Sequence, residues 1–125
     1  MAILDYRPPT SPYLDILYQD NDIVVLNKPS GLLSVPGKNP EHFDSLMLRV
    51  QSVWPTSGVV HRLDMMTSGI IVMAMHKDAL RFLNKEFSDR NTDKFYIAVV
   101  SGHIEQDTGS IDLPLICDWP NRPKQ

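Results

Sequence analysis

The chain has 125 residues, 42% of them hydrophobic, which is enough for the core of one domain but too few to argue for two. Its formal charge is −3, from 12 basic and 15 acidic residues, and this excludes a globally basic surface, so any contact with a polyanion must be local. The single cysteine, Cys117, excludes an intramolecular disulfide. Neither a signal peptide nor a membrane-spanning apolar run is evident, so we expect a cytoplasmic protein.

Two short β-prone runs open the predicted domain. Residues 1–12 hold three prolines and no periodic apolar pattern, so we expect a flexible leader there and the domain over residues 13–125. The segment LDILYQDNDIVVLNKP (14–29) predicts a hairpin that turns within QDND (19–22). GLLSVPGKNPEH (31–42) follows, and its frequent Pro and Gly residues predict a long surface loop.

Two helices are predicted, each with one apolar side. The first follows Asp44, a residue able to cap its N-terminus, and ends at Pro55. The second follows Asp78, a similar cap, and ends before SDRNTD (88–93). The apolar residues that recur at helical spacing are Leu46, Val50, Val53 and Trp54 in the first helix and Leu80, Leu83 and Phe87 in the second.

Further strands are expected between and after these helices. GVVHRLD (58–64) begins like a strand, MMTSG (65–69) is typical of a turn, and IIVMAMH (70–76) predicts a buried strand. KFYIAVVSG (94–102) and TGSIDLPLI (108–116) predict two more strands, whereas DWPNRPKQ (118–125) shows no helix or strand signal. Because helices and strands interleave without a regular βαβ repeat, we predict an α+β fold with a mixed, mostly antiparallel sheet and helices packed on it.

The densest cluster of reactive side chains is His61-Arg62-Leu63-Asp64, which the small residues Thr67-Ser68-Gly69 follow. A carboxylate at a strand end, with a guanidinium two residues earlier and a flexible turn after it, suits a site approached by a ligand. From these residues alone, an ordinary strand-end ion pair beside a Ser/Thr turn is the favoured interpretation, because surface Arg–Asp pairs are common and weak.

A family resemblance changes that balance. HRLDMMTSG (61–69) resembles, residue for residue, the HRLDxxTSG signature of the RluA family of pseudouridine synthases. NKPSGLLSVPG (27–37) before it, and KFYIAVVSG (94–102) after it, which is similar to the family's KxYxAxVxG strand, occur in the family order. The resemblance implies a pseudouridine synthase catalytic fold and the isomerisation of uridine to pseudouridine within RNA, with no cofactor and no metal. The implied partners are 23S ribosomal RNA and the anticodon stem-loop of tRNA.

The resemblance also implies roles for individual residues. Asp64 takes the place of the catalytic carboxylate, which could add to the anomeric carbon or remove a ribose proton; both routes stay open. Tyr96 matches the active-site tyrosine and would stack on the uracil, the alternative being an ordinary Tyr in an apolar strand. Arg62 would contact phosphate or fill the space of the flipped base, the alternative being a structural ion pair. Lys94, on the same strand face as Tyr96, would orient the site electrostatically.

Other candidates for substrate or RNA contact are Thr67 in the turn, Lys28 beside the Gly/Pro loop, and His61. For His61 a structural or loop-orienting role is favoured over a role as a base. His61 and Asp64 lack a third ligand at suitable spacing, so we expect no metal site. Basic residues at positions 77, 81 and 85 form one helix stripe, for which a solvated face is favoured over phosphate contact because acidic residues interleave.

Complete members of the family carry a further motif, GRxHQLRxH, whose Arg pairs with the catalytic Asp, and this chain has no such segment. We therefore expect the N-terminal portion of a truncated catalytic domain, inactive or weakly active alone, with self-association through an exposed sheet edge as a consequence. The alternative is a non-catalytic RNA-binding or interaction module on the same scaffold.

Overall fold

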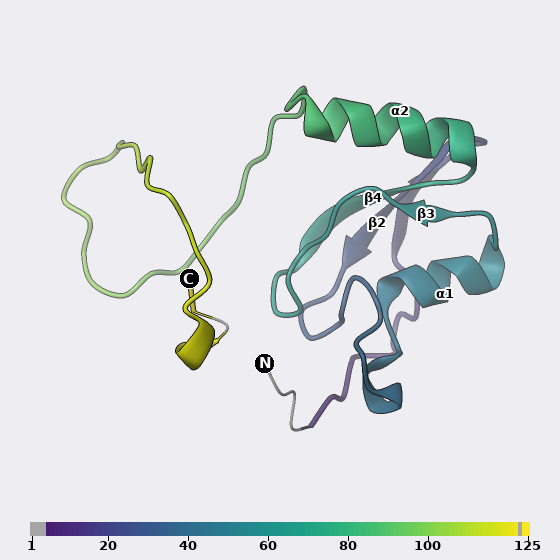
Figure 1. The fold of residues 1–125 in the computed structure, drawn as a ribbon, viewed down its shortest axis with the longest axis horizontal. Helices are drawn as coiled ribbons and strands as arrows, with labels where there is room; N and C mark the ends of the chain where they lie inside the picture. Colours follow the sequence, from purple (N-terminus) through teal and green to yellow (C-terminus); the bar gives the residue numbers. More distant parts are fainter. Residues whose placement is uncertain (1–4, 123) are drawn as a thin grey trace. The chain divides into compact units, whose positions relative to one another are not determined.

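The structure is a computed structural model that describes residues 5–122 and 124–125 (Figure 1). The chain divides into two units between Asp93 and Lys94. The helices and strands of the first unit carry its core, whereas the second unit has a single turn of 3-10 helix, η2 (Trp119–Asn121), within its described part. No helix in residues 5–122 and 124–125 is long and apolar enough to cross a membrane.

A four-stranded sheet forms the centre of the first unit. Its order is β1-β2-β4-β3, and all three pairings are antiparallel, which confirms the predicted α+β class. The β2–β4 pairing runs without interruption from Ile23 opposite Ala74 to Lys28 opposite Gly69. The strand bounds are β1 (Ile16–Gln19), β2 (Ile23–Lys28), β3 (Gly58–Val59) and β4 (Gly69–Ala74).

The expected hairpin joins β1 to β2. The Asp20 carboxylate accepts hydrogen bonds from the backbone N–H groups of Asp22 and Ile23, each at 2.8 Å. An Asp side chain that accepts from the backbone two residues later is a common way to close a turn. These bonds also lower the pKa of Asp20. The prediction of a hairpin at this position is therefore confirmed.

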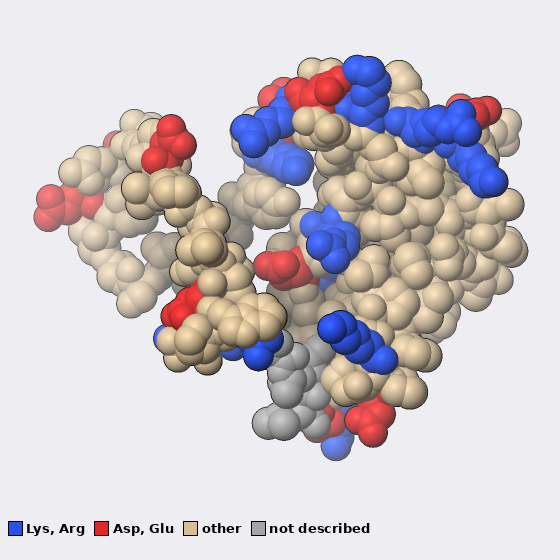
Figure 2. Space-filling model, viewed as in Figure 1, with Lys and Arg blue, Asp and Glu red and all other residues tan. Residues whose placement is uncertain are grey.

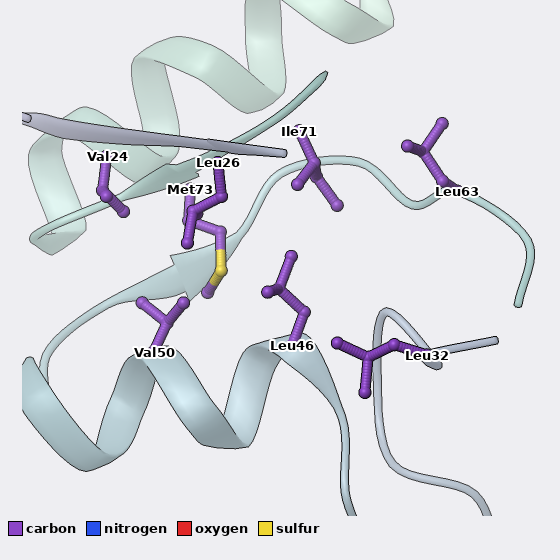
Figure 3. Close-up of a cluster of buried hydrophobic side chains, with 8 residues drawn as sticks. All are labelled: Val24, Leu26, Leu32, Leu46, Val50, Leu63, Ile71 and Met73. Atoms are coloured by element: carbon purple, nitrogen blue, oxygen red, sulfur yellow. The ribbon is translucent and has the colours of Figure 1, made fainter. Parts of the chain in front are cut away.

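The hydrophobic core lies between the sheet and α1 (Leu46–Val53) (Figure 3). Side chains of a strand alternate between its two faces, so every second residue of β2 and of β4 points towards the helix. Two core residues come from loops, Leu32 after β2 and Leu63 before β4, so the core extends beneath the loops that carry the sequence motifs. The eight core residues are Val24, Leu26, Leu32, Leu46, Val50, Leu63, Ile71 and Met73.

The predicted helix caps are each displaced from the observed ones. Ser45, not Asp44, caps α1, and its Oγ accepts from the Leu48 N–H at 3.3 Å. Asp44 instead forms a two-pronged ion pair with Arg49, with N–O distances of 2.8 and 2.7 Å. Arg49 is only 1% exposed and lies over the Tyr13 ring. A buried guanidinium without an anionic partner would be strongly destabilising, so Asp44 pairs with Arg49 and does not cap the helix.

A histidine caps the second helix, α2 (Lys77–Ser88), where the sequence favours Asp78. His76 Nδ1 accepts from the Ala79 N–H at 3.2 Å, and its Nε2 lies 2.7 Å from the Asp22 carboxylate. Asp78 lies in the first turn and pairs with Arg81. α2 packs against β3 and β4, on the side of the sheet away from α1 (Figure 1). Its apolar residues are only partly buried.

Residues 5–12 contain no helix or strand, and one of them is hydrogen-bonded to the loops that flank the core. The hydroxyl of Tyr6 donates to the carbonyl of Asp44 at 2.7 Å and accepts from the Leu33 N–H at 2.9 Å. Partial burial raises the pKa of Tyr6. The predicted leader therefore contacts the loop that follows β2.

The two strands predicted in the second unit do not form. Residues 94–102 and 108–116 have no ladder partner within the described chain, and the side chains of Phe95, Ile97 and Val99 are essentially fully exposed. A strand is stabilised by hydrogen bonds to a neighbour, so a run of β-prone apolar residues without a neighbour does not suffice. The tail also differs from prediction, because Asp118 and Asn121 close the turn η2 with a backbone bond and a side-chain bond.

Candidate active site

Asp64 lies in the loop that joins β3 to β4, and it is exposed. The residue before it, Leu63, is buried in the core, while Arg62 on the other side of Leu63 is exposed as well. Neighbouring side chains of an extended segment point to opposite sides, so burying Leu63 turns Arg62 and Asp64 outward. The Thr67 N–H donates to the Asp64 carbonyl at 3.0 Å and turns the chain back towards β4. The carboxylate is therefore open to a ligand.

Arg62 has no hydrogen bond or ion pair with any residue in the described ranges. The strand-end ion pair between Arg62 and Asp64, which the residues alone favour, does not form here. A planar guanidinium exposed two residues from an exposed carboxylate is well suited to hold a phosphate or to stack on a base.

The two motifs before α2 are hydrogen-bonded to each other. The Gly31 N–H donates to the Met65 carbonyl at 2.8 Å, and the Ser30 hydroxyl donates to the Met66 carbonyl at 2.8 Å. Gly31 has φ +92°, a backbone conformation that residues with a side chain rarely adopt. The loop after β2 thus holds the backbone that directly follows Asp64.

Ser34 holds the backbone on the other side of Asp64. Its hydroxyl donates to the Leu63 carbonyl at 2.6 Å and accepts from the Leu63 N–H at 3.1 Å. Ser34 is 5% exposed, and Leu32 beside it is part of the core. The prediction that residues 31–42 form a surface loop is therefore wrong for its first part, because the loop dips into the core before it returns to the surface at η1 (Pro40–His42).

Lys28 lies beneath these loops and is 0% exposed. Its ammonium donates to the carbonyls of Pro29, Leu32 and Met65 at 2.9, 2.6 and 3.0 Å. Desolvation lowers the pKa of Lys28 to about 8, and the negative charge of Asp64 opposes that shift. The predicted direct contact between Lys28 and RNA does not fit this burial, and Lys28 instead joins the two loops beside Asp64.

His61 anchors the start of the Asp64 loop to the sheet. Its Nε2 accepts a hydrogen bond from the Val72 N–H of β4 at 3.0 Å. This bond follows the pairing of β4 with β3, which ends at Val59. Its ring also stacks on Phe87 of α2, with the ring centroids 4.6 Å apart. These contacts agree with the loop-orienting role favoured for His61, and they require Nε2 to be unprotonated.

Tyr96 and Lys94 belong to the second unit, and Tyr96 is 64% exposed. The strand that would place both side chains on one face does not form in this structure. Their proximity to Asp64 therefore stays a prediction that the resemblance supports.

Basic side chains gather along α2, and acidic ones lie among them (Figure 2). Arg81 lies 3.6 Å from Asp78, and Lys85 pairs with Asp89 one turn later. These pairs reduce the positive field along the stripe, which agrees with the favoured interpretation of a solvated helix face. Within the described residues, no three His, Cys, Asp or Glu side chains come together as metal ligands would.

Sequence reasoning missed the residues that hold the Asp64 loop. Gly31 had a signal in the sequence, because it lies in a Pro/Gly-rich turn and glycine is the residue that adopts a positive φ there. Ser34 gave no such signal, since a serine in a Pro/Gly-rich loop usually contacts water. Only the fold reveals that it faces Leu63, 29 residues away in the sequence.

Comparisons with known proteins identify the family of this chain. Residues 22–124 match the model of the RNA pseudouridylate synthase family. The chain is 58% identical over all of its 125 residues to the dual-specificity RNA pseudouridine synthase RluA of Vibrio parahaemolyticus, of which it covers 50%. It is 57% identical to the protein of the same name from Escherichia coli K12, again over its whole length, and covers 57% of that protein.

Solved structures give the same family. Human RNA pseudouridylate synthase domain containing 4 aligns with 62% of this chain at 29% identity and a TM-score of 0.51, and the alignment covers 30% of the human chain. The chain spans about half the length of the curated relatives it matches. Because the family model covers most of the chain and both kinds of relatives carry the same activity in their names, this chain belongs to the RNA pseudouridylate synthase family.

Proposed function

We propose that this chain supplies the catalytic aspartate of an RNA pseudouridine synthase. The observation that carries the proposal is the position of Asp64, an exposed residue on a loop whose backbone is held on both sides by hydrogen bonds, those to Leu63 being buried. A reacting group needs both properties, because substrate must reach it and its geometry must be fixed before substrate arrives. The proposal extends to the whole protein the activity named for the relatives.

The reaction is an isomerisation, so it needs no added reactant. The bond between N1 of uracil and C1′ of ribose breaks, the uracil turns while still held, and a bond forms between C5 and C1′. The C5 proton is lost and N1 gains one, which balances the equation. The Asp64 carboxylate acts either by adding to C1′ and leaving again, or by removing a ribose proton that is later returned.

The target nucleotide must leave the helical stack, because its C1′ and C5 cannot both be handled inside it. Arg62 would occupy the vacated space or hold the adjacent phosphate, since it is exposed and has no ion pair within the described chain. Tyr96 would stack on the flipped uracil, Lys94 would orient the site electrostatically, and Thr67 would line the turn next to Asp64.

For substrates we propose 23S ribosomal RNA and tRNA, in the latter the anticodon stem-loop, and therefore a cytoplasmic location. Support comes from the relatives named as dual-specificity enzymes. The net charge of −3 requires that RNA be held by local groups such as Arg62. β1 forms an edge of the sheet with exposed residues, and we propose it as the place where two copies would associate.

The test uses the product of the reading frame that encodes this chain, incubated with RNA that carries tritium at C5 of uridine. Forming the C5–C1′ bond releases that tritium to water, so its release measures the reaction. The wild-type protein is expected to release tritium, and Asp64→Asn, which keeps the size of the side chain, is expected to lower the rate at least ~10³-fold by removing the reacting group.

The control variant is Asp78→Asn, which changes the carboxylate of the exposed pair on α2. This variant changes the same chemical group at the surface and is expected to keep wild-type release. If Asp64→Asn releases tritium as fast as Asp78→Asn, the catalytic role is wrong. If the wild-type protein binds RNA but releases no tritium, a non-catalytic RNA-binding module is the better description.

A further inference from the structure

Asp64 is held by its backbone, not by its side chain. Its carboxylate receives no hydrogen bond from the rest of the described chain, so its position depends on the residues on either side of it. On the C-terminal side, the Met65 carbonyl is bound twice, by Lys28 and by Gly31. On the N-terminal side, Leu63 is the last residue before the carboxylate, and both of its backbone polar groups bind one side chain.

That side chain is Ser34. A serine hydroxyl has one donor and can accept as well, so it can satisfy a backbone carbonyl and a backbone N–H of the same residue. Here it does both, at 2.6 Å to the carbonyl and 3.1 Å from the N–H. Ser34 and Leu63 are buried, which keeps water from replacing either bond.

The surroundings leave this hydroxyl little freedom. The Ser34 carbonyl accepts from the Met47 N–H at 3.1 Å, so the N-terminus of α1 holds the Ser34 backbone. Leu32, which lies two residues before Ser34, and Leu63 itself both pack in the core. The hydroxyl therefore links a rigid helix end to the residue that precedes Asp64.

We propose that Ser34 is a positioning residue for the reaction, which it serves by fixing the backbone of Leu63 and with it the direction of the Asp64 carboxylate. This inference rests on the proposed function of Asp64. Loss of the hydroxyl leaves the fold in place but lets the Asp64 loop shift. A shift of about 1 Å at a reacting group can cost up to roughly 10²-fold in rate, so we expect Ser34→Ala to lower kcat about 10- to 100-fold with KM changed less than about twofold.

A matched control separates this role from a loss of stability. Ser45→Ala makes the same change at another buried serine bonded to backbone, the cap of α1. It is expected to lower the melting temperature about as much as Ser34→Ala while keeping kcat within about twofold of wild type. Ser34→Thr keeps the hydroxyl and is expected to retain most of the kcat that Ser34→Ala loses.

The experiment uses the protein that the whole reading frame encodes. It measures kcat, KM and melting temperature for the wild type, Ser34→Ala, Ser34→Thr, Ser45→Ala and Asp64→Asn. Amide hydrogen exchange of the 125-residue chain is a second readout, in which Ser34→Ala should speed exchange at Leu63 at least ~10-fold more than at Val25, whose exchange reports only the loss of global stability. If Asp64→Asn stays active, the proposed function fails. If Asp64→Asn is inactive, three outcomes would each overturn only the role of Ser34. Ser34→Ala could keep its kcat, it could lose no more kcat than Ser45→Ala, or Ser34→Thr could have a kcat no higher than that of Ser34→Ala.

Discussion

β4 and the segment 94–100 are built from similar residues, yet they adopt different structures. GIIVMA in β4 is bonded to β2 along its whole length and to β3 at its end, and its inward side chains are buried. KFYIAVV in the second unit is a comparable apolar run, but it has no ladder within the described chain and its side chains are exposed. The difference shows that an apolar, β-prone run forms a strand only where a neighbouring strand and an opposing layer exist.

The same comparison separates the two parts of the candidate site. Asp64 and Arg62 belong to a unit with its own core, and buried contacts determine how they are presented. Tyr96 and Lys94 belong to the segment that lacks pairing. We therefore expect substitutions in the core beneath the sheet to lower the free energy of unfolding strongly and substitutions in residues 94–116 to lower it little, and the following substitutions test this contrast.

The largest effect is expected from a cavity in the core. Leu26 of β2 is completely buried, so Leu26→Ala should lower the free energy of unfolding by about 3 kcal/mol, through lost burial and the cavity left behind. Ile97→Ala, in the exposed segment, should change it by less than about 0.5 kcal/mol. Urea unfolding of both variants of the 125-residue chain measures the contrast. Equal losses would mean that residues 94–100 are packed in solution.

A somewhat smaller loss is expected from the buried ion pair. Arg49→Met removes the guanidinium that binds Asp44 twice and lies over Tyr13, which should cost about 2–3 kcal/mol because Asp44 keeps some access to water. The control is Arg122→Met, which removes a guanidinium that lies over Trp119 in the second unit and should cost less than about 0.5 kcal/mol. A loss below 1 kcal/mol for Arg49→Met would contradict the burial of this pair.

Lys28 should make the folding stability of the first unit depend on pH. Its pKa is lowered to about 8 in the folded protein from 10.5 when unfolded, so between these values the unfolded chain binds more protons. Folding stability from this group therefore rises as pH increases through that window and is lost again as pH falls to about 8. From pH 7 to pH 9.5 the gain should be about 2 kcal/mol in wild type relative to Lys28→Met. An unchanged difference at the two pH values would show that the ammonium is solvated.

The smallest effect is expected at Ser57, a buried hydroxyl that has no hydrogen-bond partner among the described residues. Removing an unsatisfied buried polar group while leaving its backbone in place should be neutral or stabilising by up to about 1 kcal/mol. Ser57→Ala should therefore raise the melting temperature slightly, whereas Ser34→Ala should lower it. A clear loss at Ser57 would mean that its hydroxyl binds a water or another group.

Most of the first unit could be predicted from the sequence because its signals are local. The hairpin at Asp20, the two amphipathic helices and the buried strand IIVMAMH each follow from patterns within a few residues. Asp44 does not cap α1 because it pairs with the buried Arg49, and His76 caps α2 while its other ring nitrogen contacts Asp22, a partner distant in the sequence. The strands expected at 94–102 and 108–116 depend on distant partners, which a local pattern does not reveal.

The same distinction holds for the candidate site. Asp64 could be singled out because its motif is contiguous, and its exposure is compatible with the role predicted for it, which stays a prediction. Lys28 was predicted to contact RNA because it flanks the Gly/Pro loop. In the fold it is buried, and its ammonium donates to three carbonyls that only the folded chain brings together. Ser34 was missed for the related reason that its partner, Leu63, lies in a different loop.

The most direct test of the central claim, that Asp64 is the reacting group, is a nucleoside analysis of the product. The protein of the full reading frame is incubated with tRNA and 23S ribosomal RNA transcripts, which are then digested so that uridine and pseudouridine can be separated and counted. We expect that the wild type forms pseudouridine in both RNAs and that Asp64→Asn binds both RNAs but forms none. Pseudouridine made by Asp64→Asn at the wild-type rate would contradict this claim.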